Sequence, residues 1–213
     1  MTDIVLDIDN LVVGLGKNPN GQRIIEGVSL KVDDGETLCV VGESGSGKSV
    51  TALTVMGLLQ KGALVPSGGS VKLVGEELLT ASDRRLRQLR ATTMAMIFQE
   101  PMTALNPVVP VGRQIDEVLR VHTDLDARAR RRKILDMMEQ VRLPEVARIF
   151  ASYPHRLSGG QRQRIMIAMA LVLEPKLLIA DEPTTALDVT TQKQILTLIR
   201  DLQRDHGTAV LFI

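Results

Sequence analysis

Short aliphatic stretches dominate the first part of the chain. They lie at residues 4–8, 11–13 and 28–32, and segments rich in Gly, Asn and Pro separate them. Short β-branched or alternating stretches between such residues are typical of strands joined by turns. The pattern predicts an antiparallel sheet near the N-terminus.

A different pattern follows, in which apolar residues run almost without interruption. Residues 37–41 form such a run, and a glycine-rich segment and a helix-compatible segment at 50–59 come after it. Residues 94–98 and 177–180 form similar runs that are followed by polar residues. Continuous runs are expected for parallel strands buried on both faces, whose carboxyl ends are where α/β sheets place their sites. We therefore predict an α/β core with strand, glycine loop and helix in succession.

Helical spacing marks two later segments, each with one apolar face. The face of the first helix holds Ile134, Met137, Met138 and Val141, and Pro144 is expected to stop this helix. The face of the second holds Ile195, Leu198, Ile199 and Leu202, and Gly207 is its expected C-terminal cap. Residues 209–213 read as a core strand at which the sequence stops, so we expect a piece of a longer protein.

Composition places the chain among folded globular proteins. Its 213 residues are 44% hydrophobic and 24% charged, which suits one domain and argues against disorder. With 26 Lys and Arg against 25 Asp and Glu the net charge is +1, so no overall basic field recruits nucleic acid. The longest apolar stretch, residues 165–173, is shorter than the ~20 residues of a membrane span, and the N-terminus lacks a secretory signal. We expect a cytoplasmic chain.

Two basic clusters and the single cysteine have plain structural interpretations. Residues 128–133 form one cluster, for which a solvated helix face is favoured over nucleic-acid contact because the total charge is near zero. Cys39 excludes an intrachain disulfide and is expected to be a small buried residue of its apolar run. The other basic cluster, interpreted in the same way as the first, consists of Arg84, Arg85, Arg87 and Arg90.

The glycine-rich segment matches the phosphate-binding loop pattern, a Gly followed after four residues by Gly-Lys-Ser. In such loops backbone N–H groups converge on phosphate oxygens at a helix N-terminus. Lys48 is expected to reach the β- and γ-phosphates, and Ser49 to bind Mg²⁺. A plain glycine turn is the alternative, and the position directly after an apolar strand argues against it. The expected nucleotide-binding residues here are Gly42, Glu43, Ser44, Gly45, Ser46, Gly47, Lys48 and Ser49.

Two acidic residues, Asp181 and Glu182, follow the apolar run at 177–180. A carboxylate at the tip of a parallel strand beside a phosphate loop can bind Mg²⁺, and its neighbour can orient or deprotonate the attacking water. We assign the metal to Asp181 and the water to Glu182. The alternative is an acidic pair that only ends a strand before a turn at Pro183, and it loses weight beside a phosphate loop.

A second anion-binding helix N-terminus is predicted at Ser158, which Gly159 and Gly160 follow. A Ser at the N-cap and two glycines leave N–H groups accessible to an anion. Because one chain has no need for two triphosphate sites, we expect the second site to serve the nucleotide of a partner. An ordinary helix cap is the alternative, and it explains Ser158 but not the two glycines.

Together these motifs occur in the order typical of ATP-binding-cassette (ABC) ATPases, and the chain resembles that family up to Ile213. The resemblance rests on the phosphate loop, Gln99, the segments 157–161 and 186–188, and the pair Asp181-Glu182. Within the family, the segments 42–49, 97–107 and 153–161 resemble the importers of dipeptides, oligopeptides and nickel.

The resemblance implies a fold for the whole chain, residues 1–213. It is an α/β P-loop NTPase core with a mixed sheet, formed by residues 1–98 and 158–213. An N-terminal antiparallel β subdomain belongs to this core. An α-helical insert subdomain is expected at residues 99–157.

Roles for single residues follow from the same resemblance. Two cassettes pack head to tail, so that the signature residues of one chain contact the γ-phosphate bound by the other. Gln99 would sense Mg²⁺ and the water, and it joins Lys48 and Glu182 as a catalytic residue. Asp188 would lie at the dimer contact, although an N-cap of the following helix explains this residue equally well. The signature residues are Ser158, Gly159, Gly160 and Gln161.

The implied cofactors are ATP and Mg²⁺, and the implied partners are a second ATPase subunit, identical or different, and transmembrane permease subunits. An extracytoplasmic solute-binding protein takes part indirectly, and nucleic acid is not expected. The segment 100–107 would contact a cytoplasmic helix of the permease, so that the chain lies peripherally at the cytoplasmic face of the cell membrane. ATP-driven dimer closure would power the import of peptides or a related small solute. The alternatives are a soluble ABC ATPase that acts on nucleic acid and a catalytically impaired nucleotide-binding fragment.

Two departures from the family pattern bear on activity. Where the family stacks an aromatic residue on adenine, this chain offers the aliphatic residues Leu15 or Ile24. The family also places a histidine that contacts the γ-phosphate just beyond the strand at which this sequence stops. We therefore expect the fragment to bind nucleotide and to hydrolyse it weakly.

Overall fold

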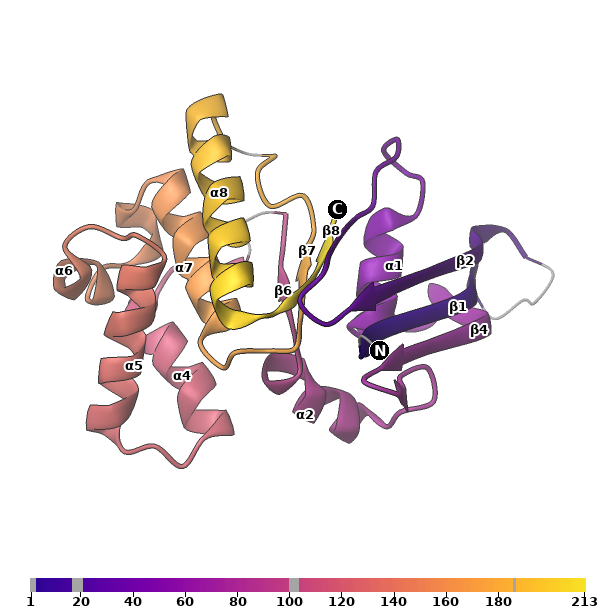
Figure 1. Cartoon of the computed structure of the whole chain (residues 1–213), viewed down its shortest axis with the longest axis horizontal. Helices are drawn as coiled ribbons and strands as arrows, with labels where there is room; N and C mark the ends of the chain where they lie inside the picture. The colour runs from indigo at the N-terminus through magenta and orange to yellow at the C-terminus, as the bar shows by residue number, and fades with distance from the viewer. Residues whose placement is uncertain (1–2, 17–20, 100–103, 186) are drawn as a thin grey trace.

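The computed structural model describes residues 3–16, 21–99, 104–185 and 187–213, and the described strands form two four-stranded sheets (Figure 1). The strands of the antiparallel sheet are, in spatial order, β2 (Arg23–Asp33), β1 (Ile4–Leu15), β4 (Leu64–Leu73) and β5 (Glu76–Glu77). Those of the parallel sheet are β3 (Thr37–Cys39), β8 (Ala209–Phe212), β7 (Leu177–Ala180) and β6 (Met94–Ile97). The α/β fold class with an antiparallel N-terminal sheet is confirmed.

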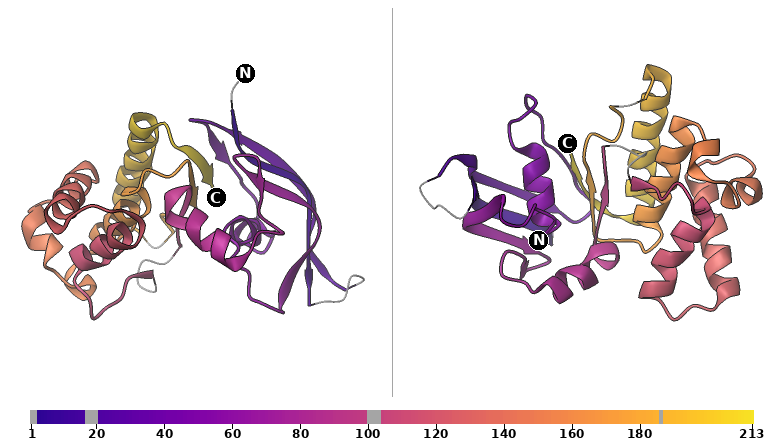
Figure 2. Two further views of the ribbon diagram at one scale, coloured as in Figure 1. Left: turned by 90° about the horizontal axis from the view of Figure 1, so that it is seen from below. Right: turned by 180° about the vertical axis from the view of Figure 1, so that it is seen from behind.

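Helices cover the parallel sheet, and three of them gather far from the antiparallel one. In Figure 1, α4, α5 and α6 lie at one end of the molecule and β1, β2 and β4 at the other, and Figure 2 shows this separation from two more sides. The helices in the first 122 residues are α1 (Lys48–Val55), α2 (Asp83–Thr92) and α4 (Val111–His122). The later ones are α5 (Ala127–Gln140), α6 (Val146–Phe150), the 3₁₀ turn η1 (Pro154–Arg156), α7 (Gly159–Leu171) and α8 (Val189–His206).

Two hydrophobic cores lie on opposite faces of the parallel sheet. Successive residues of each strand alternate between them: Ala95 and Leu178 face the core formed with α4, α5, α7 and α8, whereas Met96 and Ile179 face the core shared with β1 and α1. This alternation is the period of two of a pleated strand. Because both faces are covered, the strands of this sheet read as continuous apolar runs in the sequence.

The parallel strands bring the polar residues that follow them to the same end of the sheet, the end at which the strands have their carboxyl termini. The parallel pairing sets Ile97 of β6 beside Ala180 of β7, and Ala180 beside Phe212 of β8. The residues that follow β6 and β7 therefore emerge next to each other. These residues include Gln99, Asp181 and Glu182.

Three sequence-based expectations were wrong in detail. Cys39 is exposed, because β3 is an edge strand that pairs with β8 alone among the described strands. The helix α5 ends at Gln140, before Pro144, because the backbone turns at Arg142, whose φ is 59°. Arg90 does not lie on a solvated face: its guanidinium donates hydrogen bonds of 2.8 and 2.9 Å to the carbonyls of Met56 and Gly57, after the end of α1.

Other local expectations are confirmed. Gly207 caps α8 with a φ of 65°, a left-handed conformation that glycine adopts at little cost. The strand expected at 177–180 is β7 without a shift. None of the helices in the described ranges is both long and apolar enough to span a bilayer. The division into a core and a 99–157 insert stays a prediction.

Candidate active site

The phosphate loop, residues 42–49, connects β3 to α1. Gly47 is the N-cap of α1 with a φ of 89°, and no side chain caps this helix. An added Cβ at Gly47 would lie 3.1 Å from the carbonyl oxygen of Ile24 and 3.3 Å from Ile25, so glycine is required for close approach as well as for the turn. The uncapped N–H groups at the start of α1 form the anion-binding end of the helix dipole.

Lys48 lies across this loop. Its Nζ donates hydrogen bonds of 2.7 Å to each of the carbonyls of Gly42 and Glu43, and one of 3.4 Å to Ser46 Oγ. All three acceptors are uncharged carbonyl or hydroxyl groups. These hydrogen bonds therefore leave the positive charge of the ammonium group in place. The loop thus presents a positive charge together with the N–H groups of α1, which is the environment that phosphate groups require.

Ser49 and Asp181 are brought together across the sheet edge. Ser49 Oγ donates a hydrogen bond of 3.0 Å to Asp181 Oδ1, and the Asp181 residue is only 6% exposed. Burial raises the pKa of the Asp181 carboxyl above its usual value, an effect that the Ser49 hydrogen bond partly offsets. A hydroxyl and a carboxylate are hard oxygen donors, and Mg²⁺ is commonly held by such a pair together with substrate phosphates and waters.

Glu182 and Gln99 form the second contact at this edge. Gln99 Nε2 donates a hydrogen bond of 2.8 Å to Glu182 Oε2, and Thr185 Oγ1 donates another of 3.0 Å to the same oxygen. Because a carboxylate only accepts, the Gln99 amide must turn its nitrogen to Glu182, which leaves its oxygen available as a ligand. Glu182 has a φ of 44°, a strained backbone conformation for a residue other than glycine.

The signature residues start α7 in a capping box. Ser158 Oγ accepts a hydrogen bond from the Gln161 N–H at 3.2 Å, and Gln161 Oε1 accepts one from the Ser158 N–H at 3.0 Å. An added Cβ at Gly160 would lie 2.9 Å from Thr191 Cγ2 of α8, and one at Gly159 would lie 3.4 Å from Leu187. The glycines therefore also have a packing role, which the sequence interpretation did not foresee.

Not every expected site residue joins one cluster. Among the hydrogen bonds of the described residues, none links the phosphate loop to the residues 158–161. Asp188 is the N-cap of α8 and accepts hydrogen bonds from the Thr191 N–H and Oγ1, which lower the pKa of its carboxyl. Two parts of the expected site, Ala186 and residues 100–103, lie outside the described residues. Of the two adenine-contact candidates, Ile24 is placed beside Gly47.

Thr185 is a site residue that sequence reasoning missed. Its hydroxyl positions the Glu182 carboxylate from three residues further along the chain. The available signal was its place in the turn after Pro183, where a Thr hydroxyl within three residues of a carboxylate can bond back to it.

Comparisons with known proteins found a matching family model and relatives that cover the chain. A family model described as ABC transporter matches residues 25–185. The chain is 48% identical, over all of its length and 65% of the relative's, to the probable D,D-dipeptide transport ATP-binding protein of Escherichia coli (strain K12). It is 51% identical, over 98% of its length and 34% of the relative's, to the glutathione import ATP-binding protein of Pectobacterium atrosepticum. The chain thus spans less than two thirds of these relatives.

A solved structure shares the fold. It is the dimeric post-hydrolysis state of an ATP-binding cassette bound to ADP and Pi, with a TM-score of 0.82 and 28% identity. The match covers 97% of this chain and 86% of the other.

Proposed function

The chain belongs to the ABC transporter family, and we propose that it is the ATP-binding and ATP-hydrolysing part of an importer of peptides or a related small solute. The observation that carries the proposal is the pair of contacts at the sheet edge. Ser49 of the phosphate loop meets Asp181 at 3.0 Å, and beside them Gln99 meets Glu182 at 2.8 Å. A phosphate cradle, an oxygen ligand set and a carboxylate for water would thus lie together at the same end of the sheet.

Nucleotide binding would rest on the phosphate loop. The N–H groups at the start of α1 and the Lys48 ammonium would hold the β- and γ-phosphates, as in other P-loop NTPases. Ser49 Oγ, the Asp181 carboxylate and the free amide oxygen of Gln99 fit Mg²⁺ as hard oxygen ligands. When bound, Mg²⁺ would neutralise the charge that develops on the phosphate oxygens.

Glu182 would orient the attacking water and accept its proton. Gln99 Nε2 and Thr185 Oγ1 both donate hydrogen bonds to Oε2 of Glu182, so two neighbouring residues preorganise the carboxylate. Such preorganisation is how a general base contributes to a phosphoryl transfer that involves little covalent chemistry with the protein. Gln99 would in addition link the base to the metal ligands, since one amide group serves both.

The signature would act on the nucleotide of a second subunit. No hydrogen bond among the described residues links it to the phosphate loop of its own chain, which supports this assignment, and the related cassette of known structure is dimeric. A γ-phosphate held from both subunits favours the closed dimer, and hydrolysis removes the contact that favours it. Asp188 would lie at this dimer contact while it caps α8.

Import implies further partners. The relatives are named as dipeptide transport and glutathione import ATP-binding proteins, which supports a peptide-like cargo and permease partners for this chain. We place the chain peripherally at the cytoplasmic face of the membrane, with the region 100–107 toward the permease. Residues 104–107 of this segment are described and residues 100–103 are not.

Action on nucleic acid is not favoured. The described helices of the insert region are short, with 12 residues in α4, 14 in α5 and 5 in α6, whereas the resemblance implies a long coiled coil in this region for ABC ATPases that act in DNA repair. The net charge of +1 adds no general attraction to nucleic acid.

The test replaces the proposed base. Glu182→Gln should lower ATP turnover by about 100-fold or more, because removal of a general base costs about 10²–10⁴-fold. The same variant should accumulate as an ATP-bound dimer, alone or with its natural second subunit, in size-exclusion chromatography with light scattering. Glu139→Gln on the exposed face of α5 is the matched control and should behave as wild type. Unchanged turnover in Glu182→Gln would refute the assignment.

A further inference from the structure

Gln163 is a buried side chain of α7 whose amide group has no hydrogen-bond partner. The residue is 0% exposed, and neither its Oε1 nor its Nε2 bonds to any of the described residues. Buried polar groups in folded proteins nearly always have a partner, because an unpartnered group loses its hydrogen bonds to water without replacement. The amide of Gln163 therefore costs stability in this state, and no step of the proposed reaction uses it.

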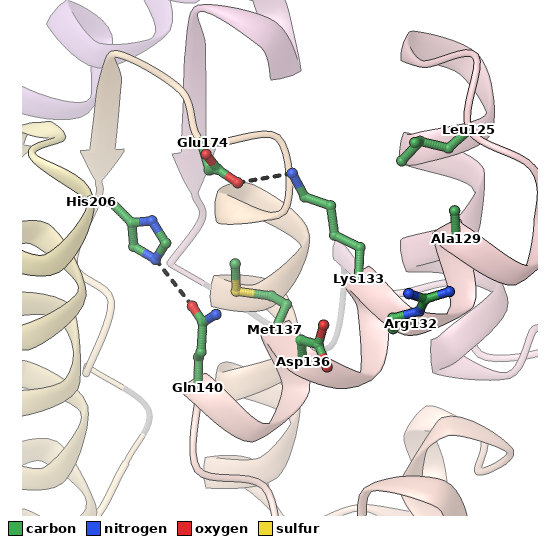
Figure 3. A pocket seen from close by; sticks show the side chains of 9 residues that line it. All are labelled: Leu125, Ala129, Arg132, Lys133, Asp136, Met137, Gln140, Glu174 and His206. Atoms are coloured by element: carbon green, nitrogen blue, oxygen red, sulfur yellow. Dashed lines mark hydrogen bonds and ion pairs between the residues drawn. The ribbon is translucent and has the colours of Figure 1, made fainter.

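Other glutamines of this chain show the usual situation. Gln114, which is also buried, accepts a hydrogen bond from the Asn106 N–H and donates one to the Asn106 carbonyl, each of 2.9 Å. Gln140 lines a cavity of about 410 Å³ between α5, α8 and the turn before β7, and its Oε1 lies 3.1 Å from Nε2 of His206 (Figure 3). The missing partners are therefore particular to the position of Gln163.

Helix geometry places Gln163 between the signature and the polar end of the parallel sheet. Residues three and four positions apart share one side of a helix. Four positions before Gln163, an added Cβ at Gly159 would lie 3.4 Å from Leu187. Three positions after it, Met166 lines a small recess together with Phe98, which follows β6. Gln163 thus lies one turn along α7 from the signature, on the side that meets the segment before α8 and the end of β6.

The segment before α8 connects two parts of the candidate site. It runs from Glu182, the proposed base, to Asp188, which caps α8. Its main chain is bonded to α8, where Gln192 Nε2 donates hydrogen bonds of 3.0 Å to the carbonyls of Thr184 and Leu187. Each carbonyl oxygen can accept a second hydrogen bond. A glutamine of α8 thus already bonds to this segment, while the buried glutamine of α7 is left without a partner.

We propose that Gln163 is a positioning residue, which hydrogen bonds to the main chain of the segment 182–188 when the nucleotide-bound dimer closes. This role rests on the proposed function, in which the signature contacts the γ-phosphate of the second subunit. That contact shifts the start of α7, and Gln163 shifts with it because both belong to one helix. The new hydrogen bonds hold Glu182 in register with the signature of its own chain. Closure is favoured because the amide has partners only in the closed state.

The experiment replaces the amide by an apolar chain of similar shape, in Q163M, and measures two properties. The Tm of the nucleotide-free chain should rise by about 2–4 °C or more, because an unpartnered buried group is removed. The Kd of the ATP-bound dimer should rise about 2- to 10-fold, because a hydrogen bond made only in the closed state is lost. This Kd is measured by light scattering in the Glu182→Gln background, with the natural second subunit where one is required. Q163L is a second variant and should change both properties in the same directions.

T208V is the matched control. Thr208 is 2% exposed, and its Oγ1 also lacks a partner among the described residues. The residue directly precedes β8, at the end of the sheet opposite to the candidate site. T208V should therefore raise the Tm as Q163M does, but it should leave the Kd of the ATP-bound dimer unchanged.

Each outcome decides between this role and a purely structural one. A higher Tm together with a weaker dimer in Q163M supports the proposal, because an amide paired equally in both states would not separate the two effects. A Tm that does not rise in Q163M overturns the proposal, since the amide is then already satisfied in the open chain. A dimer Kd equal to that of the Glu182→Gln parent overturns it as well, and in both cases the proposed function stands. If Glu182→Gln itself forms no ATP-bound dimer, the proposed function fails and this role fails with it.

Discussion

Gly160 allows the structural and the functional roles of the signature to be separated. An added Cβ at this position would lie 2.9 Å from Thr191 Cγ2. Thr191 cannot rotate away freely, because its Oγ1 donates a hydrogen bond of 2.7 Å to Asp188 at the start of α8. Gly160→Ala therefore forces α7 and α8 apart or breaks this bond. In Thr191→Ser the methyl group is removed and the hydroxyl kept.

The magnitudes can be worked from this contact. Overpacking of this kind costs about 1–3 kcal/mol, and Ala gains up to about 1 kcal/mol over Gly in a helix. Gly160→Ala alone should therefore lower the free energy of unfolding by roughly 0–2 kcal/mol, which is about 2–4 °C in Tm for each kcal/mol at this size. Without the Thr191 methyl group the same change should be neutral or stabilising. The interaction energy of the double-mutant cycle should equal the overpacking cost, about 1–3 kcal/mol.

Urea unfolding of the four proteins in the cycle gives the stability result, and ATP turnover of the assembled transporter gives the functional one. In the double variant we expect restored stability but turnover reduced about tenfold or more, because a methyl group at the start of α7 keeps the N–H groups from the phosphate of the opposite subunit. An interaction energy within about 0.5 kcal/mol of zero would refute the packing argument. Recovery of both stability and turnover would show that Gly160 matters for packing alone.

Two further predictions concern buried and exposed groups. At neutral pH without nucleotide, Asp181→Asn should resist urea better than wild type, because burial raises the folded-state pKa of this carboxyl above the unfolded value of 3.8. The protonated carboxyl stabilises the fold fully below the unfolded-state pKa, and this stabilisation is lost as the pH rises through the folded-state pKa. The stability advantage of Asp181→Asn over wild type should therefore shrink toward pH 3.8. A stability difference between the two proteins that does not change with pH contradicts this reasoning. Cys39 should react with a small maleimide in the native protein about as fast as in urea, since it is exposed, and strong protection would show that the edge of β3 is covered in solution.

Features set by local interactions could be predicted from the sequence. Gly207 ends α8 and Asp188 begins it, since each depends only on the backbone conformation and hydrogen bonds of its own turn. The strand β7 was also predicted, because a strand covered on both faces must be apolar at every position.

Features set by distant neighbours could not. The apolar run at 37–41 does not show that β3 lies at the edge of its sheet, which is why Cys39 was expected to be buried. The strand β4 contains Pro66, Gly68 and Gly69, which mask its strand character, and only its pairing with β1 reveals it. In the candidate site, the order of the motifs predicted the residues but not the hydrogen bond between Gln99 and Glu182, which depends on the pairing of β6 with β7.

The alternation of the parallel strands between two cores has a consequence for how the protein loses structure. Because β7 contributes Leu178 to one core and Ile179 to the other, the strand stays packed on one face when the core on its other face opens. A local opening of the helical side still leaves β7 packed against the opposite layer, and the reverse holds as well. The strand β7 pairs with β6 on one side and β8 on the other. We therefore expect its amide protons to exchange with solvent only when the whole domain unfolds, and the amide protons of the elements farthest from β7 to exchange through smaller openings.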